Sequence, residues 1–254
     1  MKPVKLSRQY RVVIAIIPAA GKGTRMRSVT GGGPKELLKL GSRTVLQRIT
    51  EEARDAEPDG IIVVNSPHKL AIDEWVHTQN GIQIRVQAEP CGLADAVASA
   101  EVIDDAVIFL GDAVYLGGSP VKRMANLLHR GISGCIAVEE VSQAQMHLYG
   151  IVEINEMNGS IVRILEKPSP SDTASRWAVA ARYALSVTLM ADLADFCLDP
   201  VRRALPGELS FTEFLNLSIQ AGADIRAVPL QPGQRRVDCG SPEEYALAQK
   251  EKWD

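Results

Sequence analysis

Residues 12–17 form a continuous run of apolar, mostly β-branched residues that leads directly into the segment Ala19-Ala20-Gly21-Lys22-Gly23. A strand without polar alternation is typical of a parallel sheet whose two faces are both buried. Such sheets are covered by helices on both faces, and their loops at the carboxyl ends of the strands are where ligands bind. This feature therefore favours an α/β fold with a glycine-containing loop at its first strand.

The alternation of periodic segments continues along the first half of the chain. Short apolar runs predict strands at 61–64, 82–86, 106–110 and 135–138, and helical spacing of apolar residues predicts helices at 44–56, 70–78, 93–100 and 121–129. Strands that alternate with helices favour a doubly wound α/β sheet with right-handed crossovers.

The pattern changes after about residue 148. Two short strands at 151–154 and 161–165 flank Asn158-Gly159, which predicts a hairpin. Further strands are expected at 179–185 and 225–228, and helices at 189–197, 212–221 and 242–252, the last with Ser241 as N-cap and Glu244 at the capping-box position. We expect one domain over residues 1–254 with a mostly parallel, mixed sheet. Its first half covers about 10–140 and its second half about 141–254.

Composition excludes several classes of protein and site. Lys and Arg number 28 against 31 Asp and Glu, and no block of basic residues predicts a nucleic-acid partner. The longest apolar run, at 12–20, is too short to span a bilayer, and no secretion-signal pattern precedes it, so a cytoplasmic protein is expected. The four cysteines form no C-x-x-C pair, and the histidines have no metal-ligand spacing.

The loop after the first strand has the chemistry of a phosphate site. Gly21 and Gly23 allow backbone N–H groups to approach phosphate oxygens closely, and Arg25 and Lys35 add two cations. The spacing fits neither a P-loop nor G-x-G-x-x-G, because Met26 stands at the third glycine position. We interpret the loop as a site for a polyphosphate tail.

Other polar residues follow predicted strands. Asp112 follows the strand at 106–110 and is either a ligand at the cleft or the start of an Asx-turn. Asp238 either binds a ligand or pairs with a neighbouring Arg. Lys167 precedes Pro168, which should keep it extended. The amide of Gln87 offers a donor and an acceptor to a base. Cys239 has no partnered base that would make it a nucleophile.

Seven short motifs, in order along most of the chain, resemble the sugar-1-phosphate nucleotidyltransferase family, and within it most closely the bacterial UTP–glucose-1-phosphate uridylyltransferases. They are Gly21-x-Gly23-Thr24-Arg25 with Pro34-Lys35, Gln87 with Gly92-Leu93-Ala94-Asp95-Ala96, Gly111-Asp112, Tyr149-Gly150, Glu166-Lys167-Pro168, Arg182-Tyr183 and Val237-Asp238-Cys239-Gly240.

The resemblance implies a Rossmann-like fold of the nucleotide-diphospho-sugar transferase type, with a nucleotide-binding half at about 10–140 and a sugar-phosphate-binding half at about 141–254. It implies transfer of a nucleotidyl group from an NTP, with UTP favoured, to a sugar 1-phosphate, with glucose 1-phosphate favoured. An NDP-sugar and pyrophosphate result from Mg²⁺-assisted in-line attack. A homo-oligomer is also a family expectation.

The resemblance also assigns roles to residues. It implies that Asp112 and Asp238 bind Mg²⁺, and that Arg25, Lys35 and Lys167 are catalytic. The implied nucleotide-binding residues are Ala20, Gly21, Gly23, Thr24, Gln87 and Gly92, and the implied sugar-binding residues are Gly150, Glu166 and Ala181.

Three departures from the family pattern bear on specificity. Gly31-Gly32-Gly33 stands where the uridylyltransferases carry a Lys, Asp95 replaces a His, and Ala181 replaces a Gly. Two alternatives stay open: a cytidylyltransferase for a non-sugar phosphate, and a catalytically silent homologue that binds a nucleotide sugar as a regulatory protein.

Overall fold

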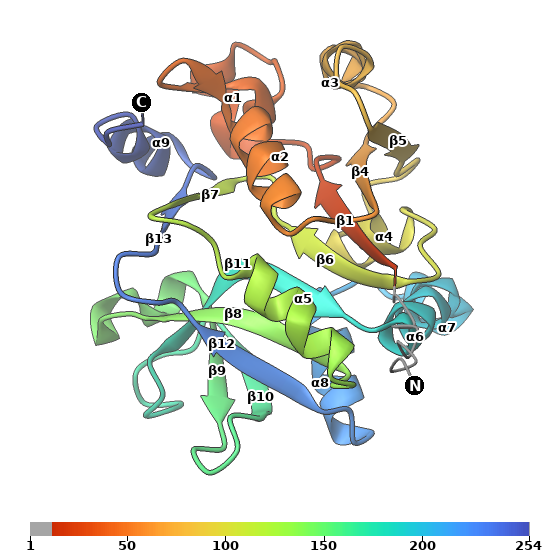
Figure 1. Cartoon of the computed structure of the whole chain (residues 1–254), viewed down its shortest axis with the longest axis vertical. Helices are drawn as coiled ribbons and strands as arrows, with labels where there is room; N and C mark the ends of the chain where they lie inside the picture. The colour runs from red at the N-terminus through yellow and green to blue at the C-terminus, as the bar shows by residue number, and fades with distance from the viewer. Residues whose placement is uncertain (1–11, 254) are drawn as a thin grey trace, which may run out of the picture.

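A nine-stranded mixed sheet forms the centre of the computed structural model, which describes residues 12–253 (Figure 1). Strand β1 (Val13–Pro18) lies between β4 (Gly60–Asn65) and β6 (Asp105–Phe109), both parallel to it, and β5 (Ile82–Val86) extends the parallel part. Residues 1–11, which contributed to the expectation of a cytoplasmic protein, lie outside the described residues.

Strand β11 (Trp177–Leu185) is antiparallel to β6 and joins the second half of the chain to the same sheet. It also pairs with β8 (Gly134–Glu140) and β9 (Gly150–Ile154), which in turn pair with β12 (Ile225–Pro229) and β10 (Ile161–Glu166) respectively. The predicted mixed, doubly wound sheet is confirmed. The division into a nucleotide half and a sugar half stays a prediction.

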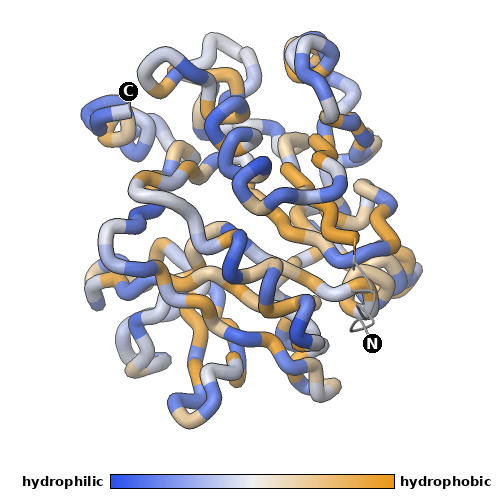
Figure 2. The backbone as a smooth tube through the Cα atoms, viewed as in Figure 1, coloured by the Kyte–Doolittle hydropathy of each residue, from blue (hydrophilic) through white to orange (hydrophobic). Residues whose placement is uncertain are grey.

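Helices cover the two faces of the sheet, and β1 shows why. Its residues Val13, Ala15 and Ile17 pack into one apolar cluster, whereas Ile16 packs into another on the opposite face. The first cluster includes residues of α2 (Val45–Asp55), α3 (Leu70–His77), α5 (Val121–His129) and α9 (Pro242–Ala248), and the second those of α4 (Leu93–Ala98), α6 (Val187–Leu198) and α8 (Phe211–Gln220). Figure 2 shows the central strands as mainly hydrophobic and the outer helices as largely hydrophilic.

The predicted elements are present, with ends that differ by a few residues. The hairpin between β9 and β10 is formed as expected, and its Gly159 adopts a φ of 74° that favours glycine. Helix α9 ends at Ala248 instead of residue 252. Ser241 caps it by accepting a hydrogen bond from the Glu244 amide at 3.2 Å, but the Glu244 carboxylate accepts from the Gly240 amide, so the reciprocal half of the predicted capping box is wrong.

The sequence analysis missed two short strands that matter for the site. Strand β7 (Ala113–Leu116) pairs antiparallel with β13 (Arg235–Asp238) and forms a separate two-stranded sheet. It also missed the ribbon of β2 (Lys39–Leu40) and β3 (Arg43–Thr44), the short helices α1 (Arg27–Thr30) and α7 (Pro200–Arg203), and the 3₁₀ turns η1 (Thr24–Met26), η2 (Lys35–Leu37) and η3 (Gln143–Leu148).

Across residues 12–253, the structure contains no helix that is both long and apolar enough to cross a membrane.

Candidate active site

The glycine loop leaves the carboxyl end of β1 and lines a cleft of about 520 Å³. The Ala19 amide donates to the Val64 carbonyl at 2.7 Å, which fixes the start of the loop beside β4. Gly23 has a φ of 59°, a conformation that favours glycine, and the buried Met26 anchors the far end. Gly21 is different, because a Cβ built on it has no atom within 4 Å. The fold itself therefore does not require glycine at that position.

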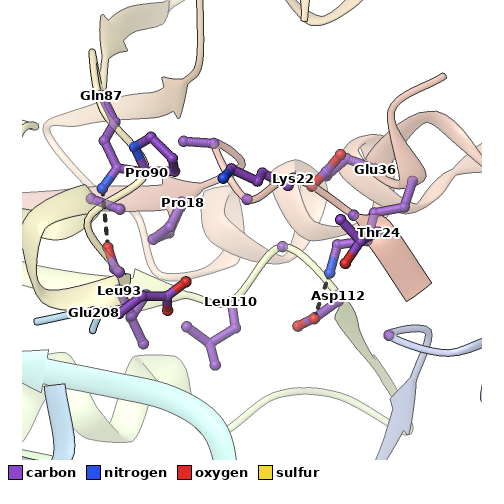
Figure 3. A pocket seen from close by; sticks show the side chains of 18 of the residues that line it. Pro18, Lys22, Thr24, Glu36, Gln87, Pro90, Leu93, Leu110, Asp112 and Glu208 are labelled. Atoms are coloured by element: carbon purple, nitrogen blue, oxygen red, sulfur yellow. Dashed lines mark hydrogen bonds and ion pairs between the residues drawn. The ribbon is translucent and has the colours of Figure 1, made fainter. Parts of the chain in front are cut away.

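Lys35 and Asp112 meet beside the glycine loop, where a Cβ on Gly23 would lie 3.9 Å from Lys35 Cγ, and Figure 3 shows Asp112 on the same side of the cleft as Thr24. Lys35 begins η2 directly after Pro34, and Asp112 lies in the turn between β6 and β7. The Lys35 Nζ donates to Asp112 Oδ2 at 2.6 Å. Burial pushes the pKa of Asp112 upward, but the charges of Lys35 and Arg25 outweigh it and hold that pKa below its usual range. The carboxylate is therefore ionised at neutral pH and available to a cation.

Asp238 lies next to Asp112 because β13 pairs with β7. Asp238 is opposite Ala113 in the register, and the Cys239 amide donates to the Asp112 carbonyl at 2.7 Å. Burial raises the pKa of Asp238 to about 6; nearby Arg236 counteracts this rise, whereas the Glu244 and Asp112 carboxylates add to it. Arg236 lies 3.4 Å from Asp238, so the pairing with a neighbouring Arg considered from the sequence is present as well.

These two aspartates have the donor chemistry of a magnesium site. Mg²⁺ binds proteins through one or two carboxylates and keeps its other positions for water and substrate phosphates. Within residues 12–253 no group of three or more Asp, Glu, His or Cys residues is arranged to hold a metal ion, so a cage made wholly of protein ligands is not formed there. A pair of carboxylates to which no cysteine or histidine of the described residues adds a third ligand suits Mg²⁺ better than Zn²⁺.

Gln87 lies at the other end of the cleft from Asp112 (Figure 3), and Gly92 lines the same cleft. The Gln87 Nε2 donates to the Gly92 carbonyl at 3.0 Å and to Asp95 Oδ2 at 2.8 Å. Both amide hydrogens of Gln87 therefore bind groups inside the protein. The sequence predicts a donor and an acceptor for the base, and the structure leaves only the acceptor, Oε1. Gly92 has a φ of 102°, and a Cβ there would lie 2.8 Å from Glu208 Cβ, so only glycine fits.

Three of the residues expected on the sugar side, Gly150, Glu166 and Lys167, lie together where β9 begins and β10 ends. Gly150 and Glu166 are register partners, and a Cβ on Gly150 would lie 3.6 Å from Glu166 Oε2. Lys167 has a φ of 47° and donates its amide to the Tyr149 carbonyl at 3.1 Å. The predicted extended conformation of Lys167 is thus wrong: Pro168 disfavours the right-handed helical region at the preceding residue, and the chain takes the left-handed region there instead of the extended one.

Ala181 also has a positive φ, of 58°, within an irregularity of β11. This backbone position suits the glycine of the family pattern, and an alanine there carries a conformational cost. The Ala181 carbonyl accepts from the Leu110 amide at 3.2 Å, which ties this irregularity to the end of β6 just before Gly111 and Asp112. The expected sugar side is therefore joined to the aspartate pair through main-chain contacts.

The structure groups most, but not all, of the expected site residues around one cleft. Its lining includes Ala20, Gly21, Gly23, Thr24, Arg25, Lys35, Gln87, Gly92 and Asp112. Gly150, Glu166, Lys167, Ala181 and Asp238 are outside that lining. Arg236 links Asp238 to the expected sugar side, since it lies beside Asp238, over the Tyr149 ring at 4.3 Å, and donates to the Val179 carbonyl at 3.1 Å.

Sequence reasoning missed a buried ion pair that supports the glycine loop. The Lys69 Nζ donates to the Ala19 carbonyl at 2.7 Å and to both carboxylate oxygens of Glu36 at 3.0 Å. Glu36 is only 1% exposed, so this pair fixes Lys35 relative to the loop. Glu36 follows Pro34-Lys35 in the sequence, but no local pattern identifies Lys69 as its partner.

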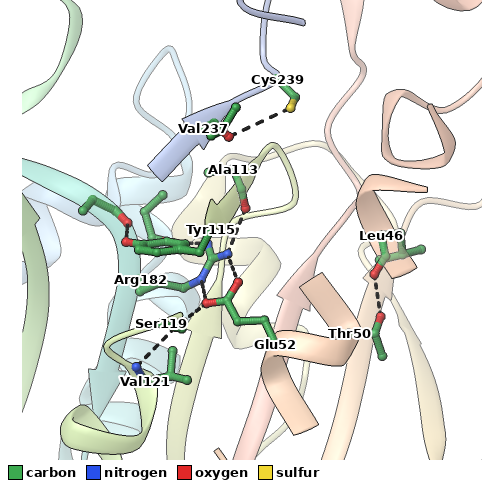
Figure 4. Close-up of polar contacts among 12 residues, drawn as sticks. Leu46, Thr50, Glu52, Ala113, Tyr115, Ser119, Val121, Arg182, Val237 and Cys239 are labelled. Atoms are coloured by element: carbon green, nitrogen blue, oxygen red, sulfur yellow. Dashed lines mark hydrogen bonds and ion pairs between the residues drawn. The ribbon is translucent and has the colours of Figure 1, made fainter. Parts of the chain in front are cut away.

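A second missed pair lies behind β7 (Figure 4). Arg182 is fully buried, donates to both oxygens of Glu52 at 2.9 and 2.5 Å, and donates to the Ala113 carbonyl at 2.8 Å. Its guanidinium also lies 4.8 Å from the Tyr115 ring centroid. The residue after Asp112 is thereby held to helix α2 and to β11.

Comparisons with known proteins agree with this arrangement. A family model described as nucleotidyl transferase matches residues 14–251. UTP–glucose-1-phosphate uridylyltransferase 2 of Staphylococcus saprophyticus is 29% identical over 94% of each chain.

Solved structures of similar fold include a UDP-glucose pyrophosphorylase complexed with UDP-glucose, with a TM-score of 0.81, 24% identity and coverage of 94% of this chain and 97% of that one. A UTP-bound pyrophosphorylase of Acinetobacter baumannii has a TM-score of 0.79 at 24% identity and covers 94% and 92%. Because the family model spans nearly all of the sheet and every strand end that lines the cleft, this chain belongs to the nucleotidyl transferase family.

Proposed function

We propose that this protein transfers the uridylyl group of UTP to glucose 1-phosphate, producing UDP-glucose and pyrophosphate. The observation that carries the proposal is the placement of Lys35, Asp112 and Asp238 beside the glycine loop at the carboxyl ends of β1 and β6. The names of the uridylyltransferase relatives supply the choice of UTP and of the sugar phosphate.

The reaction needs little covalent chemistry from the protein. The nucleophile is a phosphate oxygen that is already ionised, so no general base is required. The barrier comes from bringing two anions together and from the charge that develops on the leaving pyrophosphate. Fixed cations lower this barrier because they are in place before the reaction begins.

The cations of the cleft have separate roles in this scheme. Lys35 stabilises the α-phosphate, where the new bond forms, and Arg25 stabilises the leaving pyrophosphate. Lys167 binds the phosphate of the attacking sugar 1-phosphate, and Glu166 accepts a hydrogen bond from a sugar hydroxyl. The backbone at Gly21 and Gly23 receives the phosphate tail, and the backbone at Gly150 and Ala181 borders the sugar ring.

Asp112 and Asp238 are the residues that would hold Mg²⁺, and a bound Mg²⁺ supplies charge neutralisation for the phosphates. Asp112 accepts a hydrogen bond from Lys35. The same carboxylate would therefore contact both the metal ion and the lysine that stabilises the α-phosphate. The neighbouring Arg236 holds Asp238 in place through its ion pair.

A pyrophosphate-release assay tests the proposal. The purified protein is incubated with MgCl₂, each of UTP, dTTP, CTP, ATP and GTP, and a panel of sugar 1-phosphates, with a polyol phosphate included. We expect the highest kcat/KM for UTP with glucose 1-phosphate. Turnover restricted to CTP and a polyol phosphate, or binding of UDP-glucose without turnover, would contradict it.

A further inference from the structure

We propose that Asp95 and Arg203 are positioning residues that set the base specificity of this site, by fixing the amide of Gln87 so that it offers the nucleotide an acceptor only. The base that fits is a pyrimidine whose ring N3 carries a hydrogen, which means uracil or thymine and not cytosine. This inference rests on the proposed function, because it concerns the nucleotide substrate of the same cleft.

A continuous chain of contacts fixes the Gln87 side chain. Arg203 of helix α7 donates through Nη2 to Asp95 Oδ1 at 2.7 Å and through Nε to the Cys197 carbonyl at 2.6 Å. The other Asp95 oxygen accepts from Gln87 Nε2 at 2.8 Å, and the Gly92 carbonyl accepts the second Gln87 amide hydrogen at 3.0 Å. The Asp95 side chain is only 10% exposed, so water does not easily replace these partners.

The orientation of the amide follows from the chemistry of its partners. An ionised carboxylate and a backbone carbonyl only accept hydrogen bonds, so both must face the amide nitrogen of Gln87 and not its oxygen. The Gln87 Oε1 accepts no hydrogen bond from any residue between 12 and 253, and Gln87 lines the cleft. The polar atom that remains for a ligand is therefore an acceptor.

An acceptor in this place distinguishes the pyrimidines. Uracil and thymine carry a hydrogen on N3 that can be donated to Gln87 Oε1, whereas N3 of cytosine carries a lone pair that would face the oxygen without a proton between them. A site that leaves one polar group unpaired with the wrong ligand discriminates more strongly than one that merely loses apolar contact. Asp95 touches Gln87 and is absent from the cleft lining, so it acts through Gln87 and not on the base.

Two variants test the proposal through relative affinity. Asp95→Asn is nearly isosteric, but Arg203 keeps the oxygen of the new amide as its acceptor, so the new NH₂ faces Gln87 and favours the reversed orientation of the Gln87 amide, which only the Gly92 carbonyl then opposes. Arg203→Met removes the cation that holds Asp95. The matched control is Arg202→Met on the same helix, because Arg202 pairs with Glu213 and Asp199 and not with Asp95.

The measurement is the dissociation constant of UTP and of CTP by titration calorimetry in MgCl₂, together with kcat/KM for both nucleotides. We expect the parent and Arg202→Met to favour UTP, and Asp95→Asn to lower the UTP-to-CTP preference by about tenfold, the value of one hydrogen bond. Arg203→Met shifts the ratio in the same direction. Thermal unfolding checks that each variant is folded. If Asp95→Asn does not fold, the UTP-to-CTP preference of Arg203→Met decides the outcome.

The outcomes separate this inference from the proposed function. A parent protein that binds UTP and CTP equally, or folded variants that keep the parental ratio within about twofold, would overturn the role of Asp95 and Arg203. Absence of turnover with every sugar phosphate would overturn the proposed function, but a binding preference for UTP that Asp95→Asn abolishes would still support the inference.

Discussion

The Cys239 amide donates a hydrogen bond to the Asp112 carbonyl across 2.7 Å, and this contact joins the end of the chain to the turn after β6. It continues the pairing of Asp238 with Ala113 in the β7–β13 ribbon. Two aspartates that are distant in the sequence thereby become neighbours in the cleft region. The candidate metal site therefore depends on folding of the C-terminal ribbon as much as on the first-strand loop.

We expect Asp112→Asn to lower kcat by at least about a hundredfold, because it removes a charge that binds the cation and positions Lys35. Asp238→Asn should have a similar effect, and removal of Mg²⁺ with EDTA should abolish turnover in the parent. Steady-state pyrophosphate release at saturating substrates measures each effect. Asp192→Asn, on the exposed surface of α6, is the control. Near-parental kcat in Asp112→Asn would refute the metal assignment.

Gly21→Ala should separate binding from stability. A Cβ at Gly21 has open space around it and its φ is ordinary, so we expect a free energy of unfolding within about 0.5 kcal/mol of the parent. The same methyl group occupies the space through which phosphate oxygens approach the loop, so the KM for UTP should rise by about tenfold or more. Urea unfolding and initial rates measure the two quantities. An unchanged KM would place the phosphates elsewhere.

Glu52→Gln should destabilise the protein by about 3 kcal/mol, because it leaves the fully buried Arg182 without a counter-charge. Glu57→Gln is the matched control, since the Glu57–Lys122 pair is exposed on both sides and should leave the urea midpoint unchanged. Urea unfolding followed by circular dichroism measures both variants. Equal midpoints for the two variants would show that Arg182 is satisfied without Glu52.

Cys91 should be the thiol that reacts in the native protein. Cys135, Cys197 and Cys239 are buried, and burial raises the pKa of both the Cys197 and the Cys239 thiol to about 12. We therefore expect Ellman's reagent to label one thiol per folded chain at pH 8 and all four in urea. Rapid native labelling of Cys239, identified by mass spectrometry, would contradict the view that this residue is a structural thiol and not a nucleophile.

Strong local patterns made the sheet predictable. The unbroken apolar runs that became β1, β4 and β6 need no long-range information, and the Asn158-Gly159 turn encodes its own hairpin. The glycine loop and its two cations were predictable for the same reason.

The pairing of β7 with β13 was not predictable in this way. Each strand has only four residues, too few to show a period, and their pairing depends on a register between distant segments. The partners of the buried charges could not be predicted from the sequence for a related reason. Nothing near Lys69 in the sequence indicates Glu36, and nothing near Arg182 indicates Glu52, because these pairs are defined by helix and loop packing.

The position of β11 has a mechanical consequence. Its main chain is hydrogen-bonded to β6 in the first half of the sheet and to β8 and β9 in the second half, so both halves share one continuous ribbon of backbone. Separating or rotating the two halves as bodies would break those main-chain bonds, so the described sheet resists a hinge motion between them. Adjustment to incoming ligands then falls to the surface loops, and the exposed triple-glycine stretch at 31–33 is one segment whose residues give the backbone a wide choice of conformations.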